Sequence, residues 1–151
     1  MEHMREYTIS VLKDLIDVCR DEYTLFKTAS ENILDESLRL AFKKYSHEKE
    51  EHIIKLEAEV RRLGGDLNKT EIQKTSNQYI AKTAADTQQL LSECVRRDTI
   101  AVNLYSTAIR EDILWEVIPL VAKQYFGSKN IHDQIYNIYN KVQNAPKAAL
   151  A

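Results

Sequence analysis

The sequence contains one eight-residue pattern twice: a tyrosine, a lysine four positions later, and a histidine three positions after the lysine. The two copies are YSHEKEEH, residues 45–52, and YFGSKNIH, residues 125–132. Each copy lies within a long stretch whose apolar residues recur at helical spacing. The repeat therefore predicts two similar halves, each a pair of helices, and together an all-α four-helix bundle.

Capping residues and helix breakers divide the chain. Ser10 and Asp35 suit the N-cap positions of a first and a second helix, and Gly64 with Gly65 suits the end of the second. Asp86, with a glutamine three residues later, suits the start of the third. The expected helices span residues 10–34, 36–63, 86–112 and 115–143, in a single domain formed by residues 1–151.

Residues 66–85 are polar and form the expected connection between the second and third helices. A connection of about 20 residues can stretch to roughly 65 Å, whereas helices of this size are roughly 40 Å long. The connection can therefore cross the whole bundle, so that the second and third helices run in the same direction. A simple up-and-down bundle is the alternative, because it needs only a shorter link.

Composition limits the classes of partner. With 44% hydrophobic and 29% charged residues, the chain can bury one ordinary core. Its 21 basic and 23 acidic residues give a net charge of -2, which is no signature of nucleic-acid or anionic-membrane binding. The sequence shows neither an apolar run of the ~18–20 residues that span a bilayer nor a secretory signal. We expect a cytoplasmic protein without nucleic-acid or membrane partners, which can form a homo-oligomer.

Several ionisable residues fall on the core-facing side of their helices. On helical wheels, Glu22 and Asp98 lie near the centres of the apolar stripes of the first and third helices. In the second helix Lys49 is nearly central, with His52 to one side and Glu48 at the flank. In the fourth helix His132 is near the centre and Lys129 at the edge. All lie near the midpoints of their helices, so we expect them to meet at one level, where buried charges must be paired.

This arrangement resembles the ferritin-like superfamily, whose four-helix bundles have a long crossover between the second and third helices. In that superfamily the first and third helices each give a glutamate, and the other two each give Glu-x-x-His. Glu22, Asp98, His52 and His132 match this pattern. Lys49 and Lys129 stand where the pattern has glutamate, so two expected ligands of a di-metal site are absent.

A closer resemblance is to an uncharacterised bacterial family of ferritin-like four-helix bundles, one of the domains of unknown function. It rests on LIDVCRD at residues 15–21 and on EAEVRRLGGD at residues 57–66, with the shorter pieces Glu93-Cys94 and His132-Asp133. The resemblance covers most of residues 10–140. It implies the fold, and the family has no established activity that could be transferred.

Two interpretations of the expected cluster follow. In the first, Lys49, helped by Lys129, pairs with the carboxylates, so that an ammonium stands where a metal would otherwise sit. In the second, the lysines turn outward and iron, manganese or zinc is bound. The metal ligands would then be Glu22, Glu48, His52, Asp98 and His132.

The sequence shows no nucleophile at a recognisable distance from a base, no phosphate-binding glycine loop and no cofactor fingerprint. We therefore expect a non-catalytic bundle without a cofactor, which acts by binding or self-association in a stress or storage setting. The alternative is a di-metal carboxylate protein with oxidase or ferroxidase activity.

Overall fold

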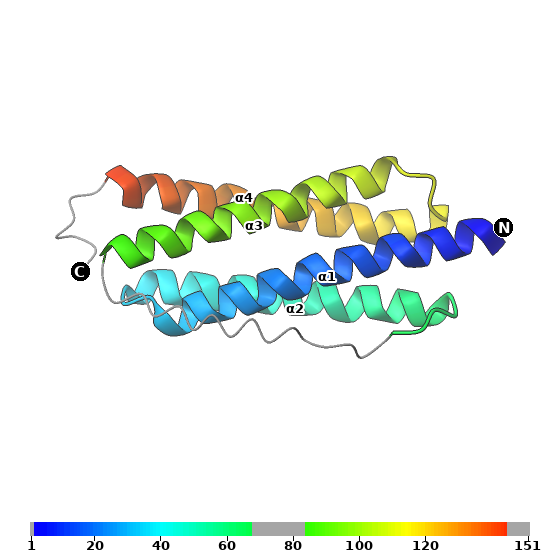
Figure 1. Ribbon diagram of the computed structural model, residues 1–151, viewed down its shortest axis with the longest axis horizontal. Helices are drawn as coiled ribbons and strands as arrows, with labels where there is room; N and C mark the ends of the chain where they lie inside the picture. Colours follow the sequence, from blue (N-terminus) through cyan, green and yellow to red (C-terminus); the bar gives the residue numbers. More distant parts are fainter. Residues whose placement is uncertain (1, 68–83, 145–151) are drawn as a thin grey trace.

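The computed structural model describes residues 2–67 and 84–144. Four long helices make up almost all of these residues, and a single 3-10 turn precedes the last helix (Figure 1). The elements are α1 (Glu2–Asn32), α2 (Glu36–Arg62), α3 (Ala84–Arg110), η1 (Trp115–Val117) and α4 (Ile118–Asn144). The predicted all-α four-helix bundle is confirmed.

The direction of the helices is that of a ferritin-like bundle. Figure 1 shows α1 and α4 running one way, and α2 and α3 running the other way. Helix α1 packs against α2 and α3, and α3 packs against α4. Because α2 and α3 are parallel, the end of α2 and the start of α3 lie at opposite ends of the bundle. Their connection is therefore the predicted long crossover. Most of the crossover predicted at residues 66–85 lies outside the described residues.

Local capping explains the turn between α1 and α2 and the end of α2. Asp35 is the N-cap of α2, as predicted, and its Oδ1 accepts a 3.0 Å hydrogen bond from the backbone N–H of Leu38. Gly64 has φ of 83°, a left-handed conformation that a side chain disfavours, and it ends α2 as predicted.

Helix α1 begins at Glu2, so the predicted start near Ser10 is wrong. Tertiary contacts hold the additional turns. Arg5 donates a hydrogen bond to the carbonyl of Leu63, and the buried Thr8 Oγ1 accepts one of 2.9 Å from the backbone N–H of Leu114. Ile9 packs against the core from the same turns. The first turns of α1 are therefore held by contacts with Leu63, which follows α2, and with Leu114, which follows α3.

The remaining helix ends differ slightly from the expected ones. Helix α3 begins two residues early, so that Asp86 lies in its first turn rather than before it. Residues 115–117, predicted as the start of the fourth helix, form η1 instead. Pro119 is then the second residue of α4, where its missing N–H leaves no intrahelical hydrogen bond unmade.

The apolar core consists of two clusters separated by a polar layer. One cluster contains Leu12, Leu15, Cys19 and Leu56, and the other contains Phe26, Phe42, Tyr45, Leu91 and Ile131. On α1 the first cluster ends at Cys19 and the second begins at Phe26, and the buried Glu22 lies between them. The polar layer thus interrupts the core near the middle of the bundle.

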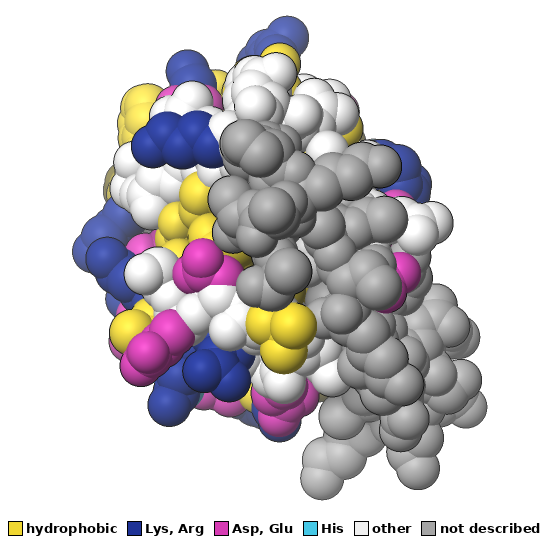
Figure 2. All heavy atoms as spheres, turned by 90° about the vertical axis from the view of Figure 1, so that its left-hand side faces the viewer, with side chains coloured by type: hydrophobic (Ala, Val, Ile, Leu, Met, Phe, Trp, Pro, Cys, Tyr) yellow, Lys and Arg dark blue, Asp and Glu magenta, His cyan; other side chains and the backbone are white. Residues whose placement is uncertain are grey.

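The outer surface carries charges of both signs. Figure 2 shows the end of the bundle where α1 leads into α2, with basic, acidic and apolar side chains interspersed on the described part of that face. None of the four α-helices, as far as they are described, has an apolar stretch long enough to span a bilayer.

Candidate functional site

The polar layer receives one fully buried polar side chain from each helix. These are Glu22 of α1, Lys49 of α2, Asp98 of α3 and Ser128 of α4, each at most 1% exposed. Each residue lies on the same helical face as apolar residues three or four positions away, which carry it into the core. The layer therefore follows from the helical periodicity of all four sequences.

Lys49 is the centre of this layer. Its Nζ lies 2.9 Å from Oε1 of Glu22 and donates a 2.8 Å hydrogen bond to Oγ of Ser128. Burial by itself lowers the pKa of Lys49, but the attraction of Glu22 and of neighbouring acidic groups outweighs burial and raises the pKa above 10.5. The ammonium is therefore charged at neutral pH and joins α1, α2 and α4.

Asp98 is buried beside this ion pair. With both carboxyl groups ionised, neither of its oxygens nor Oε2 of Glu22 would have a hydrogen-bond donor among the described residues. Burial, followed by a hydrogen bond with Glu22 and the charge of Glu22, raises the pKa of Asp98 from 3.8 to about 10. A proton held by Asp98 then supplies the missing donor, and the layer contains one ammonium, one carboxylate and one carboxylic acid.

His52 and Glu48 lie at the edge of the layer, between α2 and α4. His52 is 8% exposed, and its Nδ1 has no hydrogen-bond partner within residues 2–67 and 84–144. Burial, together with the charges of Lys49 and Lys55, lowers its pKa from 6.5 to about 3, so the ring is neutral. Oε2 of the half-buried Glu48 also has no partner in these ranges.

His132 lies on the flank of α4, outside the polar layer. Its Nε2 is 3.1 Å from Oγ1 of Thr99, its Nδ1 is 3.6 Å from the carboxylate of Asp133, and its ring stacks on Tyr136. The structure therefore does not bring His132 together with Glu22, Lys49 and Asp98, as the wheel had suggested.

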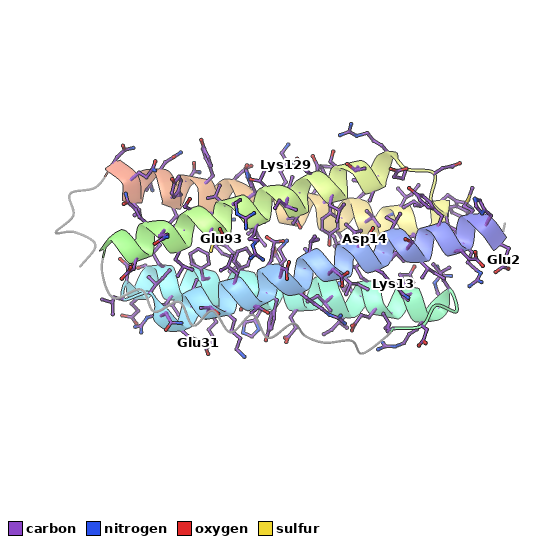
Figure 3. All side chains as sticks on the ribbon, viewed as in Figure 1. Glu2, Lys13, Asp14, Glu31, Glu93 and Lys129 are labelled. Carbon is purple, nitrogen blue, oxygen red and sulfur yellow. The ribbon has the colours of Figure 1, made fainter. Side chains whose placement is uncertain are left out.

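Lys129 is exposed, so its expected contribution to the ion cluster is wrong. Figure 3 shows it on the outer side of the pair formed by α3 and α4. The rotation of α4 turns Ser128, the preceding residue, toward Lys49. A neutral hydroxyl therefore takes the place that was expected for a second ammonium.

The layer does not fit a complete di-metal site. Within the part of the chain that the structure describes, no group of three or more His, Cys, Asp and Glu side chains is placed to hold a metal ion. The ammonium of Lys49 contacts Glu22, which the metal interpretation needs as a ligand. Neutral His52 and unpartnered Glu48 could each ligate, but they lie four residues apart on one helix.

A hydrogen-bonded chain adjoining the layer was not predicted. The hydroxyl of Tyr105 lies 3.1 Å from Sγ of Cys19 and donates a 2.7 Å bond to Oε1 of Gln124, and Nε2 of Gln124 donates to the backbone carbonyl of His52 at 3.2 Å. Gln124 and Ser128 belong to a buried stripe on α4 with Val121, Ile131 and Ile135. Centring the wheel of the fourth helix on that stripe would have found both residues.

Comparison with known proteins agrees with this architecture. The family model described as "Domain of unknown function (DUF2383)" matches residues 7–111. The chain belongs to this family. The predicted membership of an uncharacterised family of ferritin-like bundles is thereby confirmed. No curated protein matches the sequence significantly.

A solved structure shares the fold of this DUF2383 chain. It is a two-domain protein from Anabaena variabilis that contains DJ-1/ThiJ/PfpI-like and ferritin-like domains. The TM-score is 0.73 at 12% sequence identity, and the likeness covers 94% of this chain and 38% of the other. This chain thus spans well under half of the length of that protein, and the likeness establishes the ferritin-like fold alone.

Proposed function

We propose that this protein is a non-catalytic ferritin-like bundle that acts by binding or by self-association. A buried ion cluster formed by Lys49, Glu22, Asp98 and Ser128 takes the place of a complete di-metal site. The observation that carries the proposal is the position of the ammonium of Lys49, 2.9 Å from Glu22 with both side chains shielded from solvent.

Charge balance supports this assignment. A metal-binding bundle needs several ionised carboxylates facing one another, and the metal compensates their repulsion. Here Lys49 compensates the charge of Glu22, and the raised pKa of Asp98 leaves that residue neutral. The layer is therefore electrically balanced by the protein's own residues, and a metal would have to displace both a proton and an ammonium.

The deciding experiment is metal analysis of protein purified without chelator and then incubated with iron(II), manganese(II) or zinc(II). We expect the folded protein to retain less than stoichiometric metal after gel filtration. Stoichiometric metal that is lost in the variants Glu22→Ala and His52→Ala would overturn the proposal in favour of the di-metal alternative. The variant Lys129→Ala is the matched control, because Lys129 lies on the surface.

Self-association is open to a direct test. Exposed apolar side chains include Trp115 at 80% and Phe126 at 66%, and such residues are common at interfaces between subunits. Sedimentation velocity over a range of protein concentrations distinguishes a monomer from a homo-oligomer. A protein that stays monomeric and binds no small molecule would contradict the proposed mode of action.

A further inference from the structure

A pocket of about 210 Å³ opens between α2 and α4, beside the ion cluster. Residues of both helices line the pocket. Helix α2 contributes Glu48, Glu51, His52 and Lys55, which follow one face at spacings of three and four residues. Helix α4 contributes Leu120, Lys123, Gln124 and Gly127. The volume is smaller than that of a site for a drug-sized ligand, which suits a small metabolite.

The inner wall of this pocket contains polar groups without partners. His52 is more than nine-tenths buried, and its Nδ1 has no hydrogen-bond partner in the described part of the molecule. Oε2 of Glu48 is also buried without a donor there. Leaving such groups unsatisfied is costly, so a native structure normally provides a partner for them. Oε2 of Glu48 lies next to Gly127, so a hydrogen-bond donor that enters the pocket there would provide a partner for it.

Gly127 leaves room beside the same two side chains, and the ring atom of His52 that faces this room is Nε2 rather than the unpartnered Nδ1. A Cβ placed on Gly127 would lie 3.5 Å from Nε2 of His52 and 3.9 Å from Oε2 of Glu48. Both distances are ordinary van der Waals contacts, so packing does not require glycine at this position. Glycine within a helix is roughly 1 kcal/mol less favourable than alanine. The open space in front of His52 and Glu48 is therefore maintained at a cost to helix stability.

Charges of opposite sign lie at opposite ends of the pocket. Glu48 and Lys55 are seven residues apart on α2, which corresponds to roughly 10 Å along the helix axis. Helix α4 is antiparallel to α2 (Figure 1), and its Lys123 lines the pocket together with Lys55. Both lysines are exposed, whereas Glu48 is half-buried. The pocket thus has Glu48 at its inner end and the two lysines at its outer end, where the exposed Glu51, one turn before Lys55, offsets part of the lysine charge.

We propose that this pocket binds a small linear zwitterion, an ω-amino carboxylate, between α2 and α4. Its ammonium group donates to Glu48 and His52 in the space left by Gly127, and its carboxylate lies between Lys55 and Lys123. Nε2 of the neutral His52 serves as an acceptor for the ammonium, and Leu120 provides an apolar wall for the methylene chain. The inference rests on the proposed function, because it names the chemical class that a non-catalytic bundle would bind.

Titration calorimetry with ε-aminocaproate tests the proposal on the full chain. Two analogues each lack one charge: pentylamine has no carboxylate, and hexanoate has no ammonium. We expect ε-aminocaproate to bind about tenfold more tightly than either analogue, because each charged end makes its own charge-assisted contacts. No binding of ε-aminocaproate, or equal affinity for all three compounds, would overturn the proposal.

Two lysine variants of α4 locate the carboxylate end. Lys123→Ala removes a charge from the pocket, and Lys129→Ala removes the same charge from the same helix outside it. We expect Lys123→Ala to weaken the binding of ε-aminocaproate by about three- to tenfold and to leave the binding of pentylamine unchanged. Lys129→Ala should leave both affinities unchanged. Equal effects of the two variants would show a general charge effect and would contradict the assigned orientation.

Gly127→Ala separates binding from folding. The methyl group fills the space in front of His52, so binding of ε-aminocaproate should be lost. The same variant should raise the Tm by about 2–4 °C, because alanine favours the helix. A variant that is more stable and still binds with unchanged affinity would overturn the proposed site.

The two proposals fail in different measurements. If the protein binds stoichiometric metal and Glu22→Ala abolishes that binding, the ion cluster is contradicted. The calorimetry with ε-aminocaproate still tests the pocket independently. Conversely, absence of zwitterion binding contradicts the pocket assignment while metal analysis and sedimentation velocity still decide the proposed function. Ring resonances of His52 provide a local readout, because the chain has only four histidines.

Discussion

Lys49 Nζ lies 2.9 Å from Glu22 Oε1, and both side chains are shielded from solvent. Each ion loses its hydration on burial, and their mutual attraction offsets that loss only while both are present. The hydrogen bond from Lys49 to Ser128 extends the contact to a third helix. The pair and this hydrogen bond therefore link α1, α2 and α4 at one level, and a shift of α1 or α2 along its axis would separate the two buried charges.

The first prediction concerns this pair. Lys49→Met should lower the free energy of unfolding by about 3–5 kcal/mol, because it leaves Glu22 buried without a counter-charge. The double variant Lys49→Met/Glu22→Gln should recover part of that loss. Urea denaturation followed by circular dichroism measures both changes.

Lys129→Met serves as the control for Lys49→Met, since it makes the same substitution at an exposed position of the bundle. Its effect should stay within about 0.5 kcal/mol. If Lys49→Met were as stable as the wild type, the ion pair would not be the element that balances the polar layer.

The second prediction concerns the dependence of stability on pH. The pKa of Asp98 is raised from 3.8 to about 10, chiefly by burial, so the folded protein keeps a proton that the unfolded chain releases. Stability from this group is fully present below about pH 4 and is lost progressively as the pH rises toward 10. Through this group, the free energy of unfolding falls by at most ~1.4 kcal/mol for each pH unit.

Asp98→Asn removes this titration while keeping the shape of the side chain and an N–H donor for Glu22. The difference in unfolding free energy between variant and wild type should therefore shift in favour of the variant as the pH rises from about 5 to about 9. A pH-independent difference would show that Asp98 is ionised in the folded protein.

The polar layer could be predicted from the sequence because charged residues interrupt apolar helical stripes conspicuously. Glu22, Asp98 and Lys49 each stand near the centre of such a stripe, and all three are fully buried. The ends of α2 could be predicted for a different reason. Asp35 and Gly64 act through local hydrogen bonds and backbone conformation, which neighbouring residues alone determine.

Other features depend on contacts that local sequence does not encode. Helix α1 extends to Glu2 because Arg5 and Thr8 bond to residues 63 and 114, far along the chain. Ser128 was missed because a serine in an apolar stripe carries no charge to mark it. The rotation of α4, which buries Ser128 and exposes Lys129, accompanies its packing against α3 and the hydrogen bond that Ser128 accepts from Lys49 of α2.

The third prediction concerns the two thiols. Cys19 and Cys94 are fully buried, and burial raises the pKa of Cys19 from 9.0 to about 11 and that of Cys94 well above 9.0. The thiolate is the reactive form. Both cysteines should therefore resist a disulfide reagent such as DTNB in native buffer and react rapidly in denaturant. Fast reaction of the native protein would indicate frequent opening of the bundle at these positions.

The fourth prediction concerns the hydrogen-bonded chain beside the polar layer. Tyr105→Phe keeps the ring but removes the hydroxyl that donates to Oε1 of Gln124 at 2.7 Å. The amide oxygen of Gln124, which is 2% exposed, would then be left without this donor. An unsatisfied buried acceptor costs about 1–3 kcal/mol, and urea denaturation should show a loss of this size. Adding Gln124→Leu removes the stranded acceptor and should recover part of the stability, whereas additive losses would mean that the two side chains act independently.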